Sequence, residues 1–108
     1  MDALNKPLDR RIASLLSLCQ KAGKLVSGET ACEKALQTGA AKLIFVSTDA
    51  SDRTKNKFIN KSFYYKVSCH ICFEKNELSS CIGKHNRAIV AITDEGFAKA
   101  ISKDFLVE

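Results

Sequence analysis

Long hydrophobic runs are missing from this 108-residue sequence, as are tryptophan and all but one proline. No apolar stretch approaches the roughly 20 residues that a membrane-spanning helix needs, so we expect no membrane insertion. A secretory signal has an apolar block ahead of a small-residue cleavage site. The first residues, MDALNKPLDRR, contain no such block. The sequence therefore predicts a cytoplasmic protein.

Motifs of the common enzyme classes are missing as well. There is no G-x-S-x-G, phosphate-binding-loop or H-E-x-x-H pattern, and the two histidines have no evident carboxylate partner in the sequence. Asp49 and Asp52 are close enough to suggest a carboxylate pair, but a turn followed by a helix cap explains them with fewer assumptions. We therefore predict a protein that is not an enzyme and that uses neither a cofactor nor a small-molecule substrate.

The five cysteines are an odd number in a chain without an evident export signal, which favours reduced thiols over a disulfide framework. Cys69-x-x-Cys72, followed by Cys81 and His85, has the residue types of a zinc site. However, residues three apart on a strand point to opposite faces, so both sulfurs cannot bind one ion unless the strand is broken. We expect no metal here, and a zinc- or thiol-dependent enzyme is kept as one alternative.

Positive charge is in excess, with 17 Lys and Arg against 12 Asp and Glu, a net charge of +5 and a pI near 9.0. Such a balance favours a polyanionic partner. The excess is uneven, because five basic residues and no acidic one lie between Arg53 and Lys66. These residues suit either a diffuse electrostatic contact with RNA or a solvated helix face.

Apolar spacing predicts alternating helices and strands within one domain that spans residues 1–108, with a core from 8 to 105. Two continuous apolar runs, LIFVS at 43–47 and AIVAI at 88–92, predict strands that are buried on both faces. We expect further strands at 25–27 and 67–73, and helices at 8–22 (with Pro7 at its entry), 29–38, 53–65 and 74–82, and after a cap at Thr93 or Asp94. Strands that alternate with helices imply an α/β fold with a sheet covered on both faces, a three-layer α/β/α sandwich.

Several segments carry a family resemblance. GETACEKA at 28–35 is followed by TGAAKLIFVS at 38–47 and TDAS at 48–51. Together they resemble the signature of the kink-turn-binding ribosomal protein superfamily: a glycine that opens a helix, a lysine on that helix, G-x-A-K-L before a strand and D-A after it. LCQKAGKLVSGE at 18–29 and AIVAITDEGFAKAI at 88–101 are similar to its YlxQ-like bacterial branch. The resemblance covers residues 8–101, nearly the whole chain.

This resemblance implies a mixed four-stranded sheet within the α/β/α sandwich. It implies RNA as the partner, with ribosomal proteins as further candidate partners. It also implies a binding edge formed by the start of the second helix and the loop before the last strand. The residues on that edge are Gly28, Glu29, Thr30, Ala31 and Lys34 from the helix, and Ile82, Gly83, Lys84, His85, Asn86 and Arg87 from the loop.

The start of the expected helix at 29–38 is suited to binding phosphate. The first backbone N–H groups after Gly28 lack helical partners, and such an end attracts phosphate. Lys34 lies off the predicted inward stripe of this helix, so its side chain is free to reach a phosphate or a guanine edge. A solvated surface lysine is the alternative explanation, and the family resemblance favours the functional one.

Two positions depart from the family pattern. Kink-turn-binding relatives usually carry Asn two residues after the glycine and Glu or Gln three residues after it, facing sheared G·A pairs. Here those positions hold Thr30 and Ala31, and Ala31 has no polar group with which to contact a base. We therefore expect RNA binding with reduced affinity for a standard kink-turn. A protein-interaction adaptor on the same fold is the alternative function that this departure favours.

The loop at 82–87 departs in a different way. In many relatives it is more apolar, whereas here it is basic and polar, which suits contacts to the RNA backbone and stacking by His85 or Arg87. An ordinary charged surface loop is the alternative. The overall prediction is an RNA-binding accessory protein of the ribosome or of another ribonucleoprotein.

Overall fold

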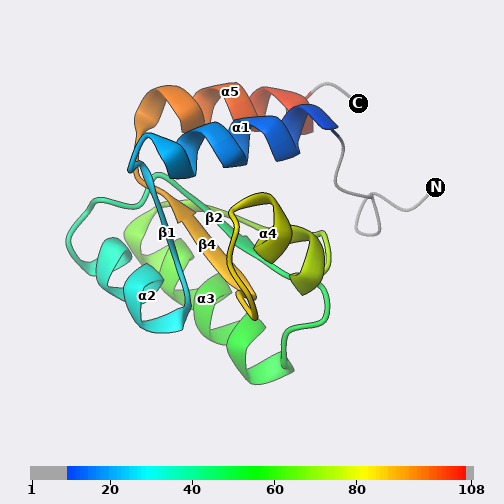
Figure 1. The fold of residues 1–108 in the computed structure, drawn as a ribbon. Helices are drawn as coiled ribbons and strands as arrows, with labels where there is room; N and C mark the ends of the chain where they lie inside the picture. The colour runs from blue at the N-terminus through cyan, green and yellow to red at the C-terminus, as the bar shows by residue number, and fades with distance from the viewer. Residues whose placement is uncertain (1–9, 107–108) are drawn as a thin grey trace.

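The computed structural model describes residues 10–106, and five helices alternate with four strands along this part of the chain (Figure 1). The predicted order of elements is therefore confirmed, while residues 7 and 8, at the expected start of the first helix, lie outside the described residues. In chain order the elements are α1 (Arg10–Lys21), β1 (Leu25–Ser27), α2 (Glu29–Gln37), β2 (Leu43–Val46), α3 (Asp52–Tyr65), β3 (Ser68–Ile71), α4 (Lys75–Cys81), β4 (Ile89–Ile92) and α5 (Glu95–Leu106).

The four strands form one mixed sheet in the order β1-β4-β2-β3. β4 runs antiparallel to both β1 and β2, whereas β2 and β3 are parallel. Phe45 of β2 lies opposite Val90 of β4 on one side and His70 of β3 on the other. The mixed sheet that the family resemblance implied is confirmed.

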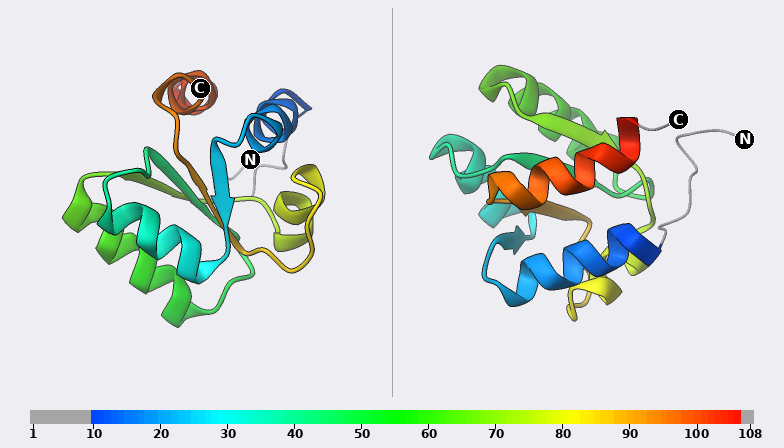
Figure 2. Two further views of the ribbon diagram at one scale, coloured as in Figure 1. Left: turned by 60° about the vertical axis from the view of Figure 1, so that its left-hand side comes forward. Right: turned by 90° about the horizontal axis from the view of Figure 1, so that it is seen from above.

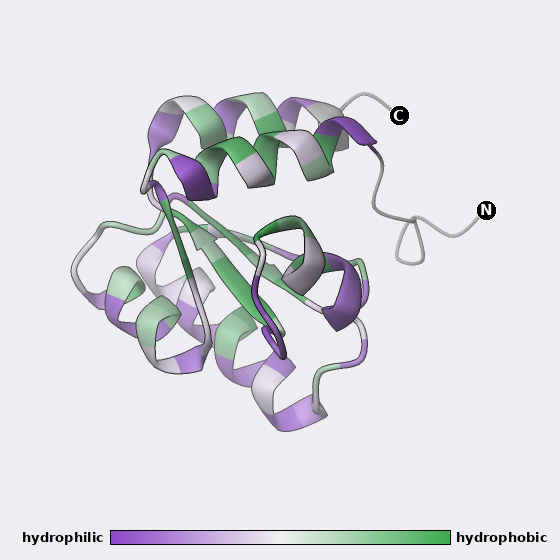
Figure 3. Ribbon diagram, in the orientation of Figure 1, coloured by the Kyte–Doolittle hydropathy of each residue, from purple (hydrophilic) through white to green (hydrophobic). Residues whose placement is uncertain are grey.

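Helices cover both faces of the sheet, with α2 and α3 on one side and α1, α4 and α5 on the other (Figure 2). Every residue of β2 and β4 is buried, because these central strands face a helix layer on each side (Figure 3). Successive residues feed the two cores alternately: Phe45 packs in the core under α1 and α5, and Ile44 in the core under α2. The three-layer sandwich is confirmed.

The third strand is shorter than the predicted range 67–73 and ends at Ile71. Its continuation turns away because Phe73 adopts a left-handed backbone with φ of 69°, and the Phe73 carbonyl accepts hydrogen bonds from the backbone N–H and hydroxyl of Thr48. Cys69 packs in the core beneath α2 and α3, whereas Cys72 belongs to the opposite core. The two thiols of the C-x-x-C pair therefore lie on opposite faces of the sheet, as the strand geometry predicts.

Side-chain caps fix two helix starts near the predicted positions. Ser51 Oγ accepts a hydrogen bond from the backbone N–H of Thr54 at the start of α3, and Asp94 Oδ2 accepts one from the N–H of Phe97 at the start of α5. Such caps satisfy donors that the first helical turn leaves unpaired. None of the described helices combines the length and apolarity needed to cross a membrane.

Candidate nucleic-acid interface

The start of α2 is held against the start of β4. Gly28, the residue before the helix, has φ of 94° and ψ of 156°, a region that is essentially restricted to glycine. Its N–H donates to the carbonyl of Ile89 at 2.9 Å. No side chain caps the helix, so the first N–H groups of α2 are left for water or for a ligand.

The loop before β4 is fixed by a buried serine. Ser79 of α4 accepts a hydrogen bond from the Arg87 N–H at 2.8 Å, and its hydroxyl donates to the Arg87 carbonyl at 3.2 Å. Between the helix and Arg87 the chain passes through two left-handed residues, Gly83 and Asn86. Lys84, His85 and Asn86 are all exposed, so a tethered backbone displays three polar side chains.

Arg87 joins the loop to the start of α2. A Cβ placed on Gly28 would lie 3.8 Å from Arg87 Nη1, so the guanidinium lies beside the glycine. Arg87 Nε is buried and has no hydrogen-bond partner among the described residues. An unpaired guanidinium donor next to uncapped helix amides is an arrangement that suits an anion.

A cleft of about 270 Å³ opens at this junction. It lies between the start of α2, the loop that leads into α3, the start of α4 and the segment before β4. Its lining residues are Gly28, Glu29, Asp49, Ala50, Ser51, Thr54, Lys75, Asn86, Ala88 and Ile89. Segments from four separate parts of the chain therefore meet where the resemblance places its binding edge.

Asp49 supplies a carboxylate to this cleft. Its Oδ1 accepts a hydrogen bond from the Lys75 N–H at 3.0 Å. Partial desolvation acts to raise the pKa of Asp49, but hydrogen bonding, including this bond to Lys75, and the nearby Lys75 charge hold it below its usual range. The carboxylate is therefore ionised at neutral pH, and the cleft presents hydrogen-bond acceptors as well as donors.

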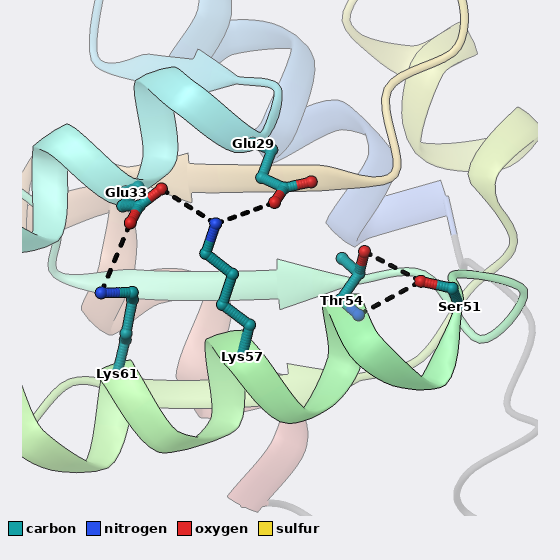
Figure 4. Close-up of polar contacts among 6 residues, drawn as sticks. All are labelled: Glu29, Glu33, Ser51, Thr54, Lys57 and Lys61. Atoms are coloured by element: carbon teal, nitrogen blue, oxygen red, sulfur yellow. Dashed lines mark hydrogen bonds and ion pairs between the residues drawn. The ribbon is translucent and has the colours of Figure 1, made fainter.

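Glu29 lines the cleft but is also engaged by α3 (Figure 4). Its Oε2 lies 2.9 Å from Lys57 Nζ, and the same ammonium lies 3.1 Å from Glu33. Glu33 also contacts Lys61 at 3.4 Å. A hydrogen bond from Lys57 lowers the pKa of Glu33, and the hydrogen bond that Lys57 donates to Glu29 raises the pKa of Lys57. We call these four residues the seam between α2 and α3.

The other α2 residues of the predicted edge lie outside the cleft. Thr30 and Lys34 are exposed and lie one helical turn apart, while Ala31 is half-buried. No ion pair of Lys34 is found among the described residues, in contrast to Lys57 in the seam. Lys34 is thus available to a partner, although the structure does not bring it to the cleft lining.

Ile82, a member of the predicted edge, has a buried side chain. Ile82 is 5% exposed and packs in the core under α1 and α4, so its side chain is not on the surface. It follows α4 as the C-terminal cap residue, where an apolar side chain anchors the loop. The exposed part of the loop begins at Gly83.

The sequence of this chain is similar to a known protein family and to two bacterial relatives. Residues 10–102 match the Ribosomal protein L7Ae/L30e/S12e/Gadd45 family. The chain belongs to this family. "RNA-binding protein YlxQ" of Enterococcus faecium is 38% identical to it over 96 residues, which are 89% of this chain and 92% of that protein. The protein of the same name from Bacillus subtilis is 40% identical over 87 residues, 81% of this chain and 87% of that protein.

Solved structures agree with the family assignment. A Bacillus halodurans protein described as having unknown function superposes on this chain with a TM-score of 0.84 and 32% identity, covering 88% of this chain and 96% of that one. The fold of this chain is therefore shared with a solved structure over 88% of its length.

For this family member, the sequence pattern missed part of the cleft wall. The sequence pattern explains Asp49 and Ser51 as a turn and a helix cap and Thr54 as part of the following helix, and it gives Lys75 no role. Ser51 does cap the helix. However, Asp49, Ser51, Thr54 and Lys75 also line the cleft. The signal available in the sequence was the D-A of the family signature at 49–50, which marks the chain exit from β2 toward this cleft.

Proposed function

We propose that this L7Ae/L30e/S12e/Gadd45 family member binds structured RNA, as an accessory protein of the ribosome or of another ribonucleoprotein. The contact surface would be the start of α2 together with residues 83–87, around the cleft. The observation that carries the proposal is the junction of uncapped α2 amides with the Arg87 guanidinium, whose Nε has no partner among the described residues. The two YlxQ relatives, named as RNA-binding proteins, supply independent support.

The chemistry of the cleft suits an RNA backbone with a neighbouring base edge. A phosphate would accept hydrogen bonds from the first α2 amides and from Arg87. The Asn86 side chain and the ionised Asp49 can contact base edges or a ribose hydroxyl, because together they offer both donors and acceptors. His85, exposed on the loop, is placed to stack on an unpaired base.

A kink-turn is expected to be a poor ligand for this surface. Thr30 and Ala31 occupy the second and third positions after Gly28, on the exposed first turn of α2. Ala31 offers no hydrogen-bonding group where kink-turn-binding relatives carry one, so a base donor facing it would remain unpaired. The proposal is therefore for structured RNA in general rather than for kink-turns.

The same observation favours a second candidate function, a protein-interaction adaptor. A surface that has lost base-contacting groups but keeps its fold can serve a protein partner. The two functions differ in what the purified protein retains: an RNA-binding protein co-purifies with nucleic acid and has a salt-dependent affinity for RNA. An adaptor shows neither.

The deciding experiment compares Arg87→Met with Lys103→Met. The first variant removes the guanidinium at the cleft but keeps an apolar stem, while Lys103 is an exposed residue of α5, on the other layer. Binding of a fluorescent structured RNA is measured at fixed salt. We expect Arg87→Met to weaken binding about tenfold, within the range for a charge-assisted contact, and Lys103→Met to behave like the parent. Equal affinities for all three proteins would refute the proposal.

A further inference from the structure

The outer face of α3 exposes more apolar surface than other described parts of the protein. The side chain of Phe63 is 85% exposed, that of Tyr64 76% and that of Ile59 41%. Single exposed hydrophobic residues are normal, but a cluster of large ones on one helix marks an interaction surface. These three residues lie within five positions of one another, toward the C-terminal half of the helix.

These residues belong to a continuous strip along α3. Residues three and four apart are neighbours on a helix surface. Ile59 therefore adjoins Asn56 and Phe63, and Asn60 adjoins Phe63 and Tyr64. All members are exposed and uncharged. We call this set the α3 strip; it consists of Asn56, Ile59, Asn60, Phe63 and Tyr64.

The rings differ in how they are held. The Tyr64 and Tyr65 ring centroids lie 4.9 Å apart with the planes at 89°, and Tyr65 packs against the core beneath α2 and α3. Tyr64 therefore leans on an anchored neighbour, while Phe63 projects into solvent. Rings fixed in this way lose little conformational entropy when a planar partner stacks on them.

Positive charge surrounds the strip. α3 and its cap residue Lys66 contain five basic residues and one acidic residue, Asp52 at the first position. Lys57 and Lys61 are neutralised in the seam. Arg53, Lys55 and Lys66 form no ion pair within the described part of the chain, and they flank the strip at its two ends.

This combination matches single-stranded nucleic acid better than a second copy of the chain. Surfaces for unpaired strands combine basic residues that follow the backbone with aromatic rings on which bases stack. A second copy would bring together the same unpaired basic residues on a chain of net charge +5. The apolar part of the strip is also small against the 20–30 residues per partner of a stable interface.

The strip lies on the same helix as part of the cleft lining but on a different face. Ser51 and Thr54, at the start of α3, line the cleft, and Phe63 follows Thr54 by nine positions. At a rise of about 1.5 Å per residue, the cleft and the strip are about 14 Å apart along the helix. Nine positions are about two and a half turns, so Phe63 faces away from Thr54, and the strip is a surface separate from the cleft.

We propose that the α3 strip is a second RNA-binding surface, which takes unpaired nucleotides by stacking bases on Phe63 and Tyr64. The asparagine amides contact the base edges, and Arg53, Lys55 and Lys66 lie along the phosphates. This surface goes beyond the function proposed for the cleft, because it is specific for single strands and does not depend on a folded RNA motif.

The test uses Phe63→Ala, Tyr64→Ala, Phe63→Trp and Lys34→Ala with two fluorescent probes: a ten-nucleotide uridine oligomer and a structured RNA without unpaired ends. Phe63 is almost fully exposed, so its replacement should leave the thermal midpoint unchanged. We expect Phe63→Ala to weaken oligomer binding at least about fivefold and to leave the structured RNA unaffected. Phe63→Trp should restore or exceed parental affinity, and Lys34→Ala should affect the structured RNA instead.

Three outcomes separate the possible failures. If Phe63→Ala and Tyr64→Ala bind the oligomer as the parent does, or the parent does not bind it, the strip is not an RNA surface. If Phe63→Ala converts a dimer to a monomer in sedimentation without RNA, the strip is a self-association surface and the proposal is overturned. If the parent binds the oligomer through Phe63 but not the structured RNA, the function proposed for the cleft fails while the strip stands.

Discussion

The cleft and the seam lie side by side on α2, yet their polar groups are in opposite states. In the seam, Glu33 and Lys57 each contact two partners of opposite charge on the neighbouring helix. At the cleft, the first α2 amides have no side-chain cap and Arg87 Nε has no partner in the described chain. Glu29 belongs to both regions, since it lines the cleft and contacts Lys57.

This contrast separates charges that serve the fold from charges that are open to a ligand. The count of lysines on α3 suggests a strongly basic helix, but the seam neutralises two of them within the protein. A buried polar group left without a partner is costly, so its presence at the cleft is better evidence for a ligand than surface charge is. Four predictions follow from this distinction, beginning with the largest expected effect.

Gly28→Val should damage the cleft more than any other single change considered. The φ of 94° is strained for a β-branched residue, so we expect unfolding free energy to fall by about 2 kcal/mol and RNA affinity to fall with it. Gly23→Val is the matched control, because Gly23 also has a positive φ (73°) and lies at the other end of β1. It should lose stability in chemical denaturation but keep RNA affinity. Parental stability and binding in Gly28→Val would show that the glycine has no special role.

The pair Thr30→Asn and Ala31→Glu should produce a gain. Each lost base contact costs about 1–3 kcal/mol, so we expect the parent to bind a standard kink-turn at least about tenfold more weakly than relatives that carry both groups. The double variant should bind it more tightly and leave plain duplex RNA unaffected. Both residues lie in the first turn of α2, where a carboxylate is compatible with the helix dipole.

Parallel titrations of parent and double variant against one kink-turn and one duplex, at a single salt concentration, measure this effect. Tight kink-turn binding by the parent, or no gain in the variant, would place the base contacts elsewhere on the surface.

Lys34→Ala and Lys61→Ala compare an open lysine with a paired one. Loss of Lys34 should weaken RNA binding by about 1–3 kcal/mol if it contacts a base edge, and by less if it contacts phosphate alone. Loss of Lys61 should leave affinity unchanged, because its charge is already matched by Glu33. Anisotropy titrations at two salt concentrations distinguish the cases. Equal losses in both variants would mean that total charge, and not pairing, determines binding.

The cysteines should give the smallest effect, namely none. Cys69 and Cys72 pack in opposite cores. Burial raises the pKa of Cys32 to about 12. Burial is also the main cause that raises the pKa of Cys81 to about 11. Protonated, buried thiols are poor metal ligands near neutral pH. We expect less than about one-tenth equivalent of zinc in the purified protein and an unchanged melting curve with a chelator. Stoichiometric zinc would contradict the observed position of β3.

Local pattern was sufficient for most of the fold. The runs LIFV and IVAI predict the two central strands because a strand covered on both faces needs apolar residues at every position. β3 was predicted too long, because the left-handed Phe73 and its bonds to Thr48 depend on a contact 25 residues away. The mixed character of the sheet came from the family resemblance, and the order of the strands was not predicted, since pairing partners are not encoded in the periodicity of either strand.

The site was predictable in outline but not in its contacts. Gly28 and the loop at 83–87 could be assigned from the family signature, and the positive φ expected of Gly28 is observed. The position of Arg87 beside Gly28 and the hydrogen bonds of Ser79 to Arg87 could not be predicted. Both are contacts between residues that only the folded chain brings together. The burial of the Ile82 side chain was not evident from the sequence, because an apolar residue that ends a helix looks the same whether it faces a core or a partner. Whether the edge residues contact RNA stays a prediction.

The position of β4 sets the order in which this protein can become functional during its synthesis. β4 is the last strand in the chain, yet it lies between β1 and β2, and Leu25 pairs with Ile92. The nascent sheet therefore has a gap at its centre until almost all of the chain has emerged, and such non-local pairing forms slowly. Gly28 donates a hydrogen bond to Ile89 of the same strand, so we expect the proposed RNA site to form only in chains that include β4.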